Sequence, residues 1–252
     1  MRVKGVHLKI SLMSRHVPFP PPSVWDRPEP IARAAPAPIS REAIVRAAIS
    51  LADRDGLEGV SLRKVAAMLK TGAMRLYGYA GTKDELLELM VDAVYAEMVD
   101  KPFAGGWRPA LDGMARRLRA AACAHPWLVD LLGGRPNHGP HVMSQLEYVL
   151  SALGDFPIES AMQALRTVTA YTIGALRVEM AERRAEARTG LDKAAWQFAN
   201  ARSVENLLSS GRFPALVTLV RDAPIMSAEE VFDTGLRQVL DGIALHLPHS
   251  DE

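Results

Sequence analysis

Beyond residue 39, hydrophobic residues recur every three to four positions, the spacing that gathers them on one face of an α-helix. The first such run follows Ser40, a favourable N-cap, and ends at Asp55-Gly56, where glycine favours a helix stop. Its apolar positions are Ile44, Ala47, Ala48 and Leu51. The pattern therefore predicts one amphipathic helix between these two signals.

Three further helices are predicted directly after it. Ser61 can cap a second, short helix, and after the turn Lys70-Thr71-Gly72 a third, very short helix covers residues 73–79. Thr82, with Glu85 three positions later, forms a capping box that opens a longer helix to about residue 98. Two short helices joined by a tight turn and packed on a preceding helix form a helix-turn-helix arrangement.

Beyond a joint at residues 102–106, the chain also reads as helices separated by turns that contain glycine or proline. The expected ranges are 107–124, 126–132, 140–153, 157–187, 192–209 and 228–247, with a shorter helix at 214–221. The sequence has no strand pattern and no internal repeat, so the expected fold class is all-α.

The first 39 residues differ from the rest. They carry eight prolines, which remove backbone donors and disfavour helix at each preceding residue. We expect a disordered, Pro-rich tail, which is either an extended arm or a stretch that precedes the native start.

The distribution of charge narrows the function. A formal net charge of +1 gives no global excess of positive charge for nucleic acid, so any such signal must be local. Residues 61–83 contain five basic side chains and no acidic one. The five are Arg63, Lys64, Lys70, Arg75 and Lys83. A solvated surface is the plain alternative for such a run, but its place on two short helices favours DNA contact.

Other function classes find little support. A single cysteine, Cys123, excludes an internal disulfide framework and a cysteine-built zinc site. His138 and His141, with His125 nearby, match no zinc spacing, and the motifs of nucleotide binding, serine hydrolysis and di-iron bundles are missing. No apolar stretch approaches the roughly 20 residues of a membrane span. We therefore expect a cytoplasmic protein that is not an enzyme, with no cofactor, no metal and no membrane partner.

The helix-turn-helix segment resembles the DNA-binding domain of the TetR/AcrR family over about residues 40–98. The resemblance is carried by Ile44-Val45-Arg46-Ala47-Ala48, Asp55-Gly56-Leu57, Ser61-Leu62-Arg63-Lys64-Val65-Ala66, Met74-Arg75-Leu76-Tyr77-Gly78-Tyr79 and Lys83-Asp84-Glu85-Leu86-Leu87. It implies a transcriptional regulator, expected to be a repressor, with double-stranded operator DNA as its partner.

By this resemblance Arg63 contacts a base or a nearby phosphate, residues 71–75 face the groove, and two tyrosines and Lys83 hold phosphates. The candidate DNA-binding residues are Arg63, Lys64, Thr71, Gly72, Ala73, Met74, Arg75, Tyr77, Tyr79 and Lys83. Their chemistry agrees, because arginine can bond guanine bidentately and Ala73 and Met74 can rest against thymine methyl groups. Leu69 and Leu76 are expected to serve the small core instead.

One position departs from the family pattern. Lys70 stands in the turn where the family usually carries glycine, and Gly72 follows two residues later. Either the left-handed residue of the turn lies elsewhere, or Lys70 adopts that conformation at a cost.

Residues 107–247 are similar to the ligand-sensing domain of the same family. The similarity is carried by His125-Pro126-Trp127, by Gly211-Arg212-Phe213-Pro214-Ala215 and by the run from Phe232 to Ile243. It implies a C-terminal helical domain for ligand binding and dimerisation, with a small apolar or amphipathic effector. The candidate pocket residues are His125, Met143, Leu146, Met162, Tyr171, Trp196 and Phe198, and plain core packing is the alternative for each.

Two helices predict a homodimer. The helix at 157–187 is apolar on most sides over its first two-thirds, and the helix at 228–247 contains Gly235 and Gly242. Interior glycines allow another helix to approach closely, so two such helices from each subunit would form a four-helix dimer interface. The dimer would bind a near-palindromic operator. An ordinary monomeric core is the alternative.

The sequence thus predicts a ligand-responsive repressor. Two other functions stay open: a helical-bundle small-molecule-binding protein or enzyme that does not bind DNA, and a structural protein that keeps the fold but has lost its operator. Footprinting on the DNA that flanks the gene separates them.

Overall fold

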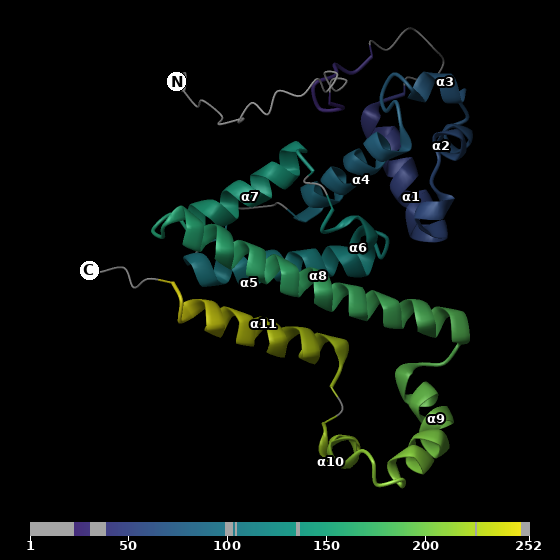
Figure 1. Cartoon of the computed structure of the whole chain (residues 1–252). Coiled ribbons are helices and arrows are strands. Elements are labelled where there is room, and N and C mark those ends of the chain that lie inside the picture. Colours follow the sequence, from purple (N-terminus) through teal and green to yellow (C-terminus); the bar gives the residue numbers. More distant parts are fainter. Residues whose placement is uncertain are drawn as a thin grey trace, which may run out of the picture.

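The computed structural model describes residues 23–30, 39–98, 103, 105–134, 137–224 and 226–247. Every regular element within these ranges is an α-helix, which confirms the all-α prediction (Figure 1). The helices are α1 (Arg41–Gly59), α2 (Leu62–Met68), α3 (Ala73–Leu76), α4 (Lys83–Met98), α5 (Trp107–Ala124), α6 (Leu128–Leu131), α7 (Pro140–Ala152), α8 (Ile158–Thr189), α9 (Lys193–Leu208), α10 (Pro214–Asp222) and α11 (Ala228–Ala244).

Local hydrogen bonds define the first helices as the sequence predicts. The Ser40 and Ser61 hydroxyls accept from the third residue beyond, at Ala43 and Lys64, and so cap α1 and α2. In α1 the chain breaks from helical geometry at Gly56, whose φ is +69°, a left-handed value that glycine adopts without a side-chain clash. The helical turn that follows, up to Gly59, is counted with α1.

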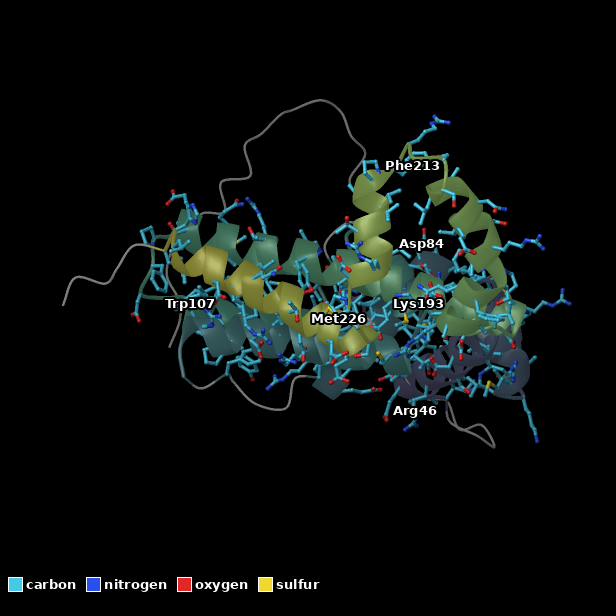
Figure 2. All side chains as sticks on the ribbon, turned by 90° about the horizontal axis from the view of Figure 1, so that it is seen from below. Arg46, Asp84, Trp107, Lys193, Phe213 and Met226 are labelled. Atoms are coloured by element: carbon cyan, nitrogen blue, oxygen red, sulfur yellow. The ribbon has the colours of Figure 1, made fainter. Side chains whose placement is uncertain are left out.

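The helices α5–α11 form a second group, which follows the helix-turn-helix unit α1–α4 along the chain. The longest helix, α8, lies at the centre of this second group. It packs against α5 on one side and α11 on another, and α6 and α7 also contact it (Figure 1). α9 and α10 contact each other and have no buried residue. Figure 2 shows these two helices, from Lys193 and Phe213 onward, in front of the body when the molecule is seen from below.

Two hydrophobic clusters hold the fold together. The first joins α1–α4 to the second half of α5, to α6 and to Leu176 and Met180 of α8. The second joins the first half of α5 to α7, α11 and the start of α8. Because the first cluster contains residues of α1–α4 together with residues of α5, α6 and α8, the helix-turn-helix unit is packed onto the second group of helices. The division into 40–98 and 107–247 therefore stays a prediction.

The expectation of a structureless N-terminal tail is wrong for residues 23–30. Val24 is only 1% exposed and belongs to the first cluster, Arg27 forms an ion pair with Glu85 of α4, and the Arg41 backbone N–H donates to Glu29 over 2.6 Å. Prolines prevent helix here, but they do not prevent Val24 and Trp25 from packing on the helices. The rest of the predicted tail lies outside the described residues.

Candidate nucleic-acid interface and ligand cavity

The turn between α2 and α3 is closed by a left-handed lysine. Lys70 has a φ of +52°, and the N–H groups of Lys70 and Thr71 donate to the carbonyls of Ala67 and Ala66. Of the two alternatives that the sequence leaves open, Lys70 therefore adopts the conformation that glycine usually takes. For a residue with a Cβ this costs about 1–2 kcal/mol.

The segment of α2 and α3 presents basic side chains and a well exposed methionine. Met74 is 81% exposed, its neighbour Arg75 is exposed, and so are Arg63 and Lys64 of α2. The guanidinium of Arg75 donates over 3.3 Å to the hydroxyl of Thr71, which lies in the turn before α3. Single exposed apolar side chains are common on protein surfaces; among the basic residues of this segment, a thymine methyl group is a partner that fits Met74.

The other candidate residues of this surface divide between solvent and core. Gly72 and Tyr77 are exposed, while Ala73 packs against the first cluster. Lys83 is exposed, and its ammonium donates to the Leu57 carbonyl over 2.9 Å, which leaves further N–H donors for a phosphate. Leu76 is fully buried and Leu69 packs against the same cluster, as expected of core residues.

The structure contradicts the prediction that Tyr79 binds a DNA phosphate. It is 6% exposed, and its hydroxyl donates to the Ile39 carbonyl over 2.7 Å. A phosphate oxygen needs that same hydrogen, so Tyr79 is not placed to bind the DNA backbone here. It holds the chain that leads into α1 instead.

Two carboxylates, one partly exposed and one buried, join the helix-turn-helix unit to the second group of helices. Asp53 of α1 accepts from the indole N–H of Trp127 over 2.7 Å, and its Oδ1 lies 2.8 Å from Nδ1 of His125. Asp92 of α4 is buried and accepts from the backbone N–H groups of His141 and Val142 over 2.9 and 3.0 Å. Asp53 thus holds the α5–α6 connection, and Asp92 caps the first turn of α7.

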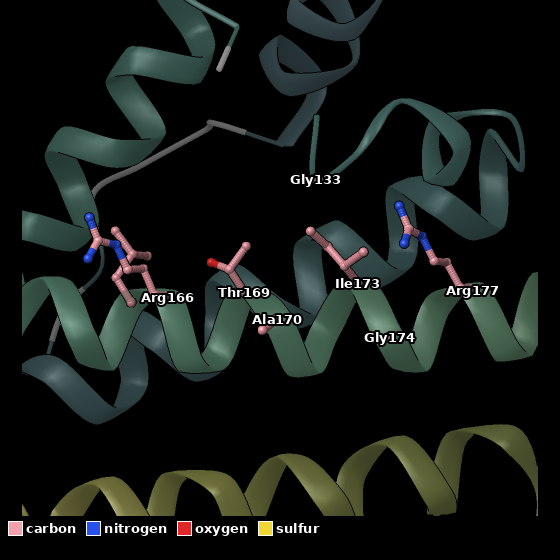
Figure 3. Close-up of a pocket in the computed structure, with 8 residues that line it drawn as sticks. Gly133, Arg166, Thr169, Ala170, Ile173, Gly174 and Arg177 are labelled. Atoms are coloured by element: carbon pink, nitrogen blue, oxygen red, sulfur yellow. The ribbon is translucent and has the colours of Figure 1, made fainter. Parts of the chain in front are cut away.

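A cavity of about 540 Å³ lies along α8 (Figure 3). It is lined by Gly133, Leu165, Arg166, Thr169, Ala170, Ile173, Gly174 and Arg177. Gly133 belongs to the connection that follows α6, and the others come from α8. The guanidinium of Arg177 also donates to the Leu132 carbonyl over 3.1 Å.

None of the seven predicted pocket residues lines this cavity. His125 lies at the Asp53 contact, Met143 is exposed on α7, and Leu146 and Met162 pack against the second cluster. Tyr171 points to the far side of α8, where its hydroxyl donates to the Phe232 carbonyl. Trp196 and Phe198 are 54% and 86% exposed on α9, since that helix does not cover the body.

The sequence did contain a signal for the cavity. Arg166 and Arg177 are the only charged residues between positions 160 and 178, in a stretch otherwise made of apolar and small polar residues. Two charges on a mostly apolar stretch of helix are the more informative observation.

The described residues give no sign of a metal or a membrane span. No three His, Cys, Asp or Glu side chains gather in a way that could hold a metal ion. No helix in the same part of the chain is both long and apolar enough to cross a membrane.

The chain resembles known regulators along most of its length. Residues 101–247 match the family model for the tetracyclin repressor-like C-terminal domain. The HTH-type transcriptional repressor DrrR1 of Streptomyces coeruleorubidus is 36% identical over 228 residues, which cover 87% of this chain and 83% of the relative. The tetracycline repressor protein class E of Escherichia coli is 26% identical over 217 residues, which cover 84% and 93%.

Solved structures agree in fold. The TetR family protein ActR of Streptomyces coelicolor, in complex with actinorhodin, matches with a TM-score of 0.71 at 27% identity, over 85% of this chain and 100% of ActR. The structure of ActR without ligand matches with a TM-score of 0.69 at 28% identity, over 84% of this chain and 97% of that one.

Proposed function

The chain belongs to the TetR family of transcriptional regulators, and we propose that it is a repressor that binds a near-palindromic operator as a homodimer and releases it when a small effector binds. Residues 40–98 would bind the DNA, and residues 107–247 would sense the effector and dimerise. As a regulator that must reach the chromosome, it would act in the cytoplasm. The relatives' names, as repressors and regulators, favour regulation over catalysis.

The observation that carries DNA binding is the acid-free surface of α2 and α3. Arg63 and Arg75 are exposed and can each reach a guanine edge with two N–H groups. Met74, exposed between them in sequence, suits a thymine methyl group, while Lys64, Tyr77 and Lys83 suit phosphates. Thr71, Gly72 and Ala73 would let the backbone at the start of α3 approach the groove.

The dimer proposal rests on apolar surface that α8 and α11 leave open. Val178 of α8, Val231 of α11 and Leu245, which directly follows α11, are all more than half exposed. A Cβ at Gly242 would meet no atom within 4 Å, so this glycine faces open space that a second subunit could fill. Gly235 has another explanation, because a Cβ there would lie 2.4 Å from the Tyr171 hydroxyl of the same chain.

Operator binding of three variants tests the proposed DNA surface. Arg63→Ala should weaken binding by about 1–3 kcal/mol and relax discrimination at one base pair, because a bidentate base contact is lost. Lys83→Ala should weaken all sequences alike and lower the salt slope by about one unit, because a phosphate contact is lost. Arg188→Ala, at the far end of α8, is the matched control that removes a positive charge elsewhere.

The DNA is the region flanking the protein's own gene, and the site is located by footprinting. Affinity is then measured by fluorescence anisotropy at several salt concentrations. If Arg63→Ala and Lys83→Ala both bind the operator as the control does, the DNA surface has been assigned to the wrong face.

A further inference from the structure

The cavity along α8 has the size and position of a small-molecule site. Its volume of about 540 Å³ lies in the range that small ligands occupy. One wall is the face of α8 formed by positions 165/166, 169/170, 173/174 and 177, spaced as one side of a helix. The opposite wall is Gly133, where a Cβ would come within 3.6 Å of Ile173. The lack of a side chain at Gly133 therefore keeps the middle of the cavity open.

The lining has an apolar middle and a positive charge at each end. Ala170, Ile173 and Gly174 form the middle, and Thr169 adds one hydroxyl. Arg166 and Arg177 are separated by eleven positions, which corresponds to about 16 Å along a helix. Figure 3 shows them at opposite ends of the lined stretch of α8. Among the residues that the structure describes, no acidic side chain lines the cavity to balance them.

The two arginines have donors to spare. Arg177 uses a guanidinium nitrogen for the Leu132 carbonyl, and a guanidinium has five N–H donors in all. Arg166 makes no hydrogen bond and no ion pair with any residue that the structure describes. A guanidinium beside an apolar surface binds a carboxylate with two parallel hydrogen bonds, which no neutral oxygen group matches in strength.

We propose that this cavity binds an elongated, largely apolar organic anion, whose carboxylate or comparable anionic group pairs with Arg166 and whose far end carries an oxygen acceptor for Arg177. The proposal rests on the proposed function, because it names the chemical class of the effector. It goes further in excluding neutral apolar molecules and cations as preferred ligands. The apolar body would supply affinity, and the two arginines would select the charge.

Two fluorescent probes that share an aromatic body test the charge selection. The anion is 8-anilino-1-naphthalenesulfonate, and the neutral probe is N-phenyl-1-naphthylamine, which lacks the sulfonate. Dissociation constants are measured by fluorescence titration on the full chain without DNA. The variants are Arg166→Gln, Arg177→Gln and Ala170→Leu, with Arg188→Gln as the control on the same helix outside the cavity.

The expected pattern separates charge from shape. Arg166→Gln should weaken the anionic probe about fivefold to tenfold, a loss limited by the exposure of this side chain, because it removes the partner of the sulfonate. Arg177→Gln should weaken it less, because the probe has no oxygen acceptor at its far end. Neither variant should change binding of the neutral probe. Ala170→Leu should weaken both probes, because its larger side chain fills the cavity. The control should bind both as the wild type does. Thermal unfolding of each variant checks that the fold is intact.

Three results would overturn the proposal: equal binding of the two probes to the wild type, arginine variants that bind the anion normally, or no effect of Ala170→Leu on either probe. Operator binding is measured separately on the same preparations. If the protein binds its operator but its anion binding does not depend on the arginines, the ligand class is rejected and the repressor function stands. If anion binding depends on the arginines but the protein binds no operator, the repressor function is rejected and the ligand class stands.

Discussion

The contact between Asp53 and Trp127 offers a quantitative test of how the helix-turn-helix unit is held. Trp127 is 3% exposed, and its indole N–H has Asp53 as its acceptor at 2.7 Å. Trp127→Phe removes the donor and keeps most of the ring, while Asp53→Ala removes the acceptor. Each single change also alters packing or leaves a polar group without a partner. Only the double-mutant cycle isolates the interaction.

The size of the interaction follows from the charge and exposure of the acceptor. A hydrogen bond to a charged group contributes about 1.5–3 kcal/mol to stability. The Asp53 side chain is 34% exposed, so solvent screens part of this, and we expect a coupling free energy of about 1–2 kcal/mol. His125, which also contacts the Asp53 carboxylate, is present in all four proteins, so its contact with Asp53 cancels in the coupling free energy.

Urea unfolding of the four proteins gives the coupling free energy by linear extrapolation. A second cycle that combines Trp127→Phe with Asp55→Ala serves as the control, because Asp55 lies on the same helix and pairs with Arg54 instead. In the control cycle the losses in the free energy of unfolding of the two single variants should add up to the loss of the double variant. If the Asp53 cycle is also additive within about 0.5 kcal/mol, the contact does not hold α1 to the α5–α6 connection.

Three further predictions concern stability. Lys70→Gly should raise the free energy of unfolding by about 1 kcal/mol, because glycine takes a φ of +52° without strain, whereas Lys70→Ala should not; thermal unfolding compares them. Glu179 is buried, which by itself raises its pKa, but hydrogen bonds and charge from Arg119 and Arg183 bring the pKa below its usual value. Its stabilisation should therefore be complete above the unfolded-state pKa near 4.5 and be lost as the pH falls through the lower folded value. Glu179→Gln should lower the free energy of unfolding by about 2–3 kcal/mol at pH 7 and make stability depend less on acid pH. Urea titrations at several pH values measure this. An unchanged acid slope would contradict the pairing of ionised Glu179 with the two arginines. Val24→Ala should lower the free energy of unfolding by about 2 kcal/mol, because it removes buried methyl groups. The control Asp26→Ala, at an exposed position, should cause no measurable change. Equal unfolding midpoints for the two variants would contradict the packing of residues 23–30.

The helices could be predicted because their signals are local. Ser40, Ser61 and Ser227 each cap a helix through a hydrogen bond to a residue three positions away, and the Ser227–Glu230 capping box is present as the sequence suggests. The same holds for the turn at Lys70, where the missing glycine leaves two alternatives: the left-handed residue lies elsewhere, or it is Lys70. The structure shows the second.

The ligand site could not be predicted in the same way. An aromatic residue on a helix indicates that the helix needs a partner, but it does not say which body supplies it. On that ground Trp196 and Phe198 are predicted to line the pocket, but α9 stands apart from α8. The contact of Asp53 could not be predicted for a related reason. Its partner Trp127 is 74 positions away, and no local pattern connects a carboxylate to a distant indole.

The positions of these contacts suggest how an effector could act on DNA binding. Trp127, which holds α1 through Asp53, and His141, which holds α4 through Asp92, lie on either side of Leu132 and Gly133 along the chain. The cavity wall is thus part of the segment that connects both contacts, and Arg177 fixes this segment through the Leu132 carbonyl.

The oxygen acceptor of the proposed ligand would draw the Arg177 guanidinium toward the cavity and so weaken its hydrogen bond to the Leu132 carbonyl, which holds this segment. Since one such hydrogen bond at an exposed arginine contributes about 1–2 kcal/mol, its loss alone lies within the 1–3 kcal/mol or so that typically couples an effector to DNA binding. Both helices that the segment holds belong to the helix-turn-helix unit. A ligand beside Gly133 would therefore act first on α1 and α4, the helices that pack against α2 and α3, and would not need to touch α2 or α3.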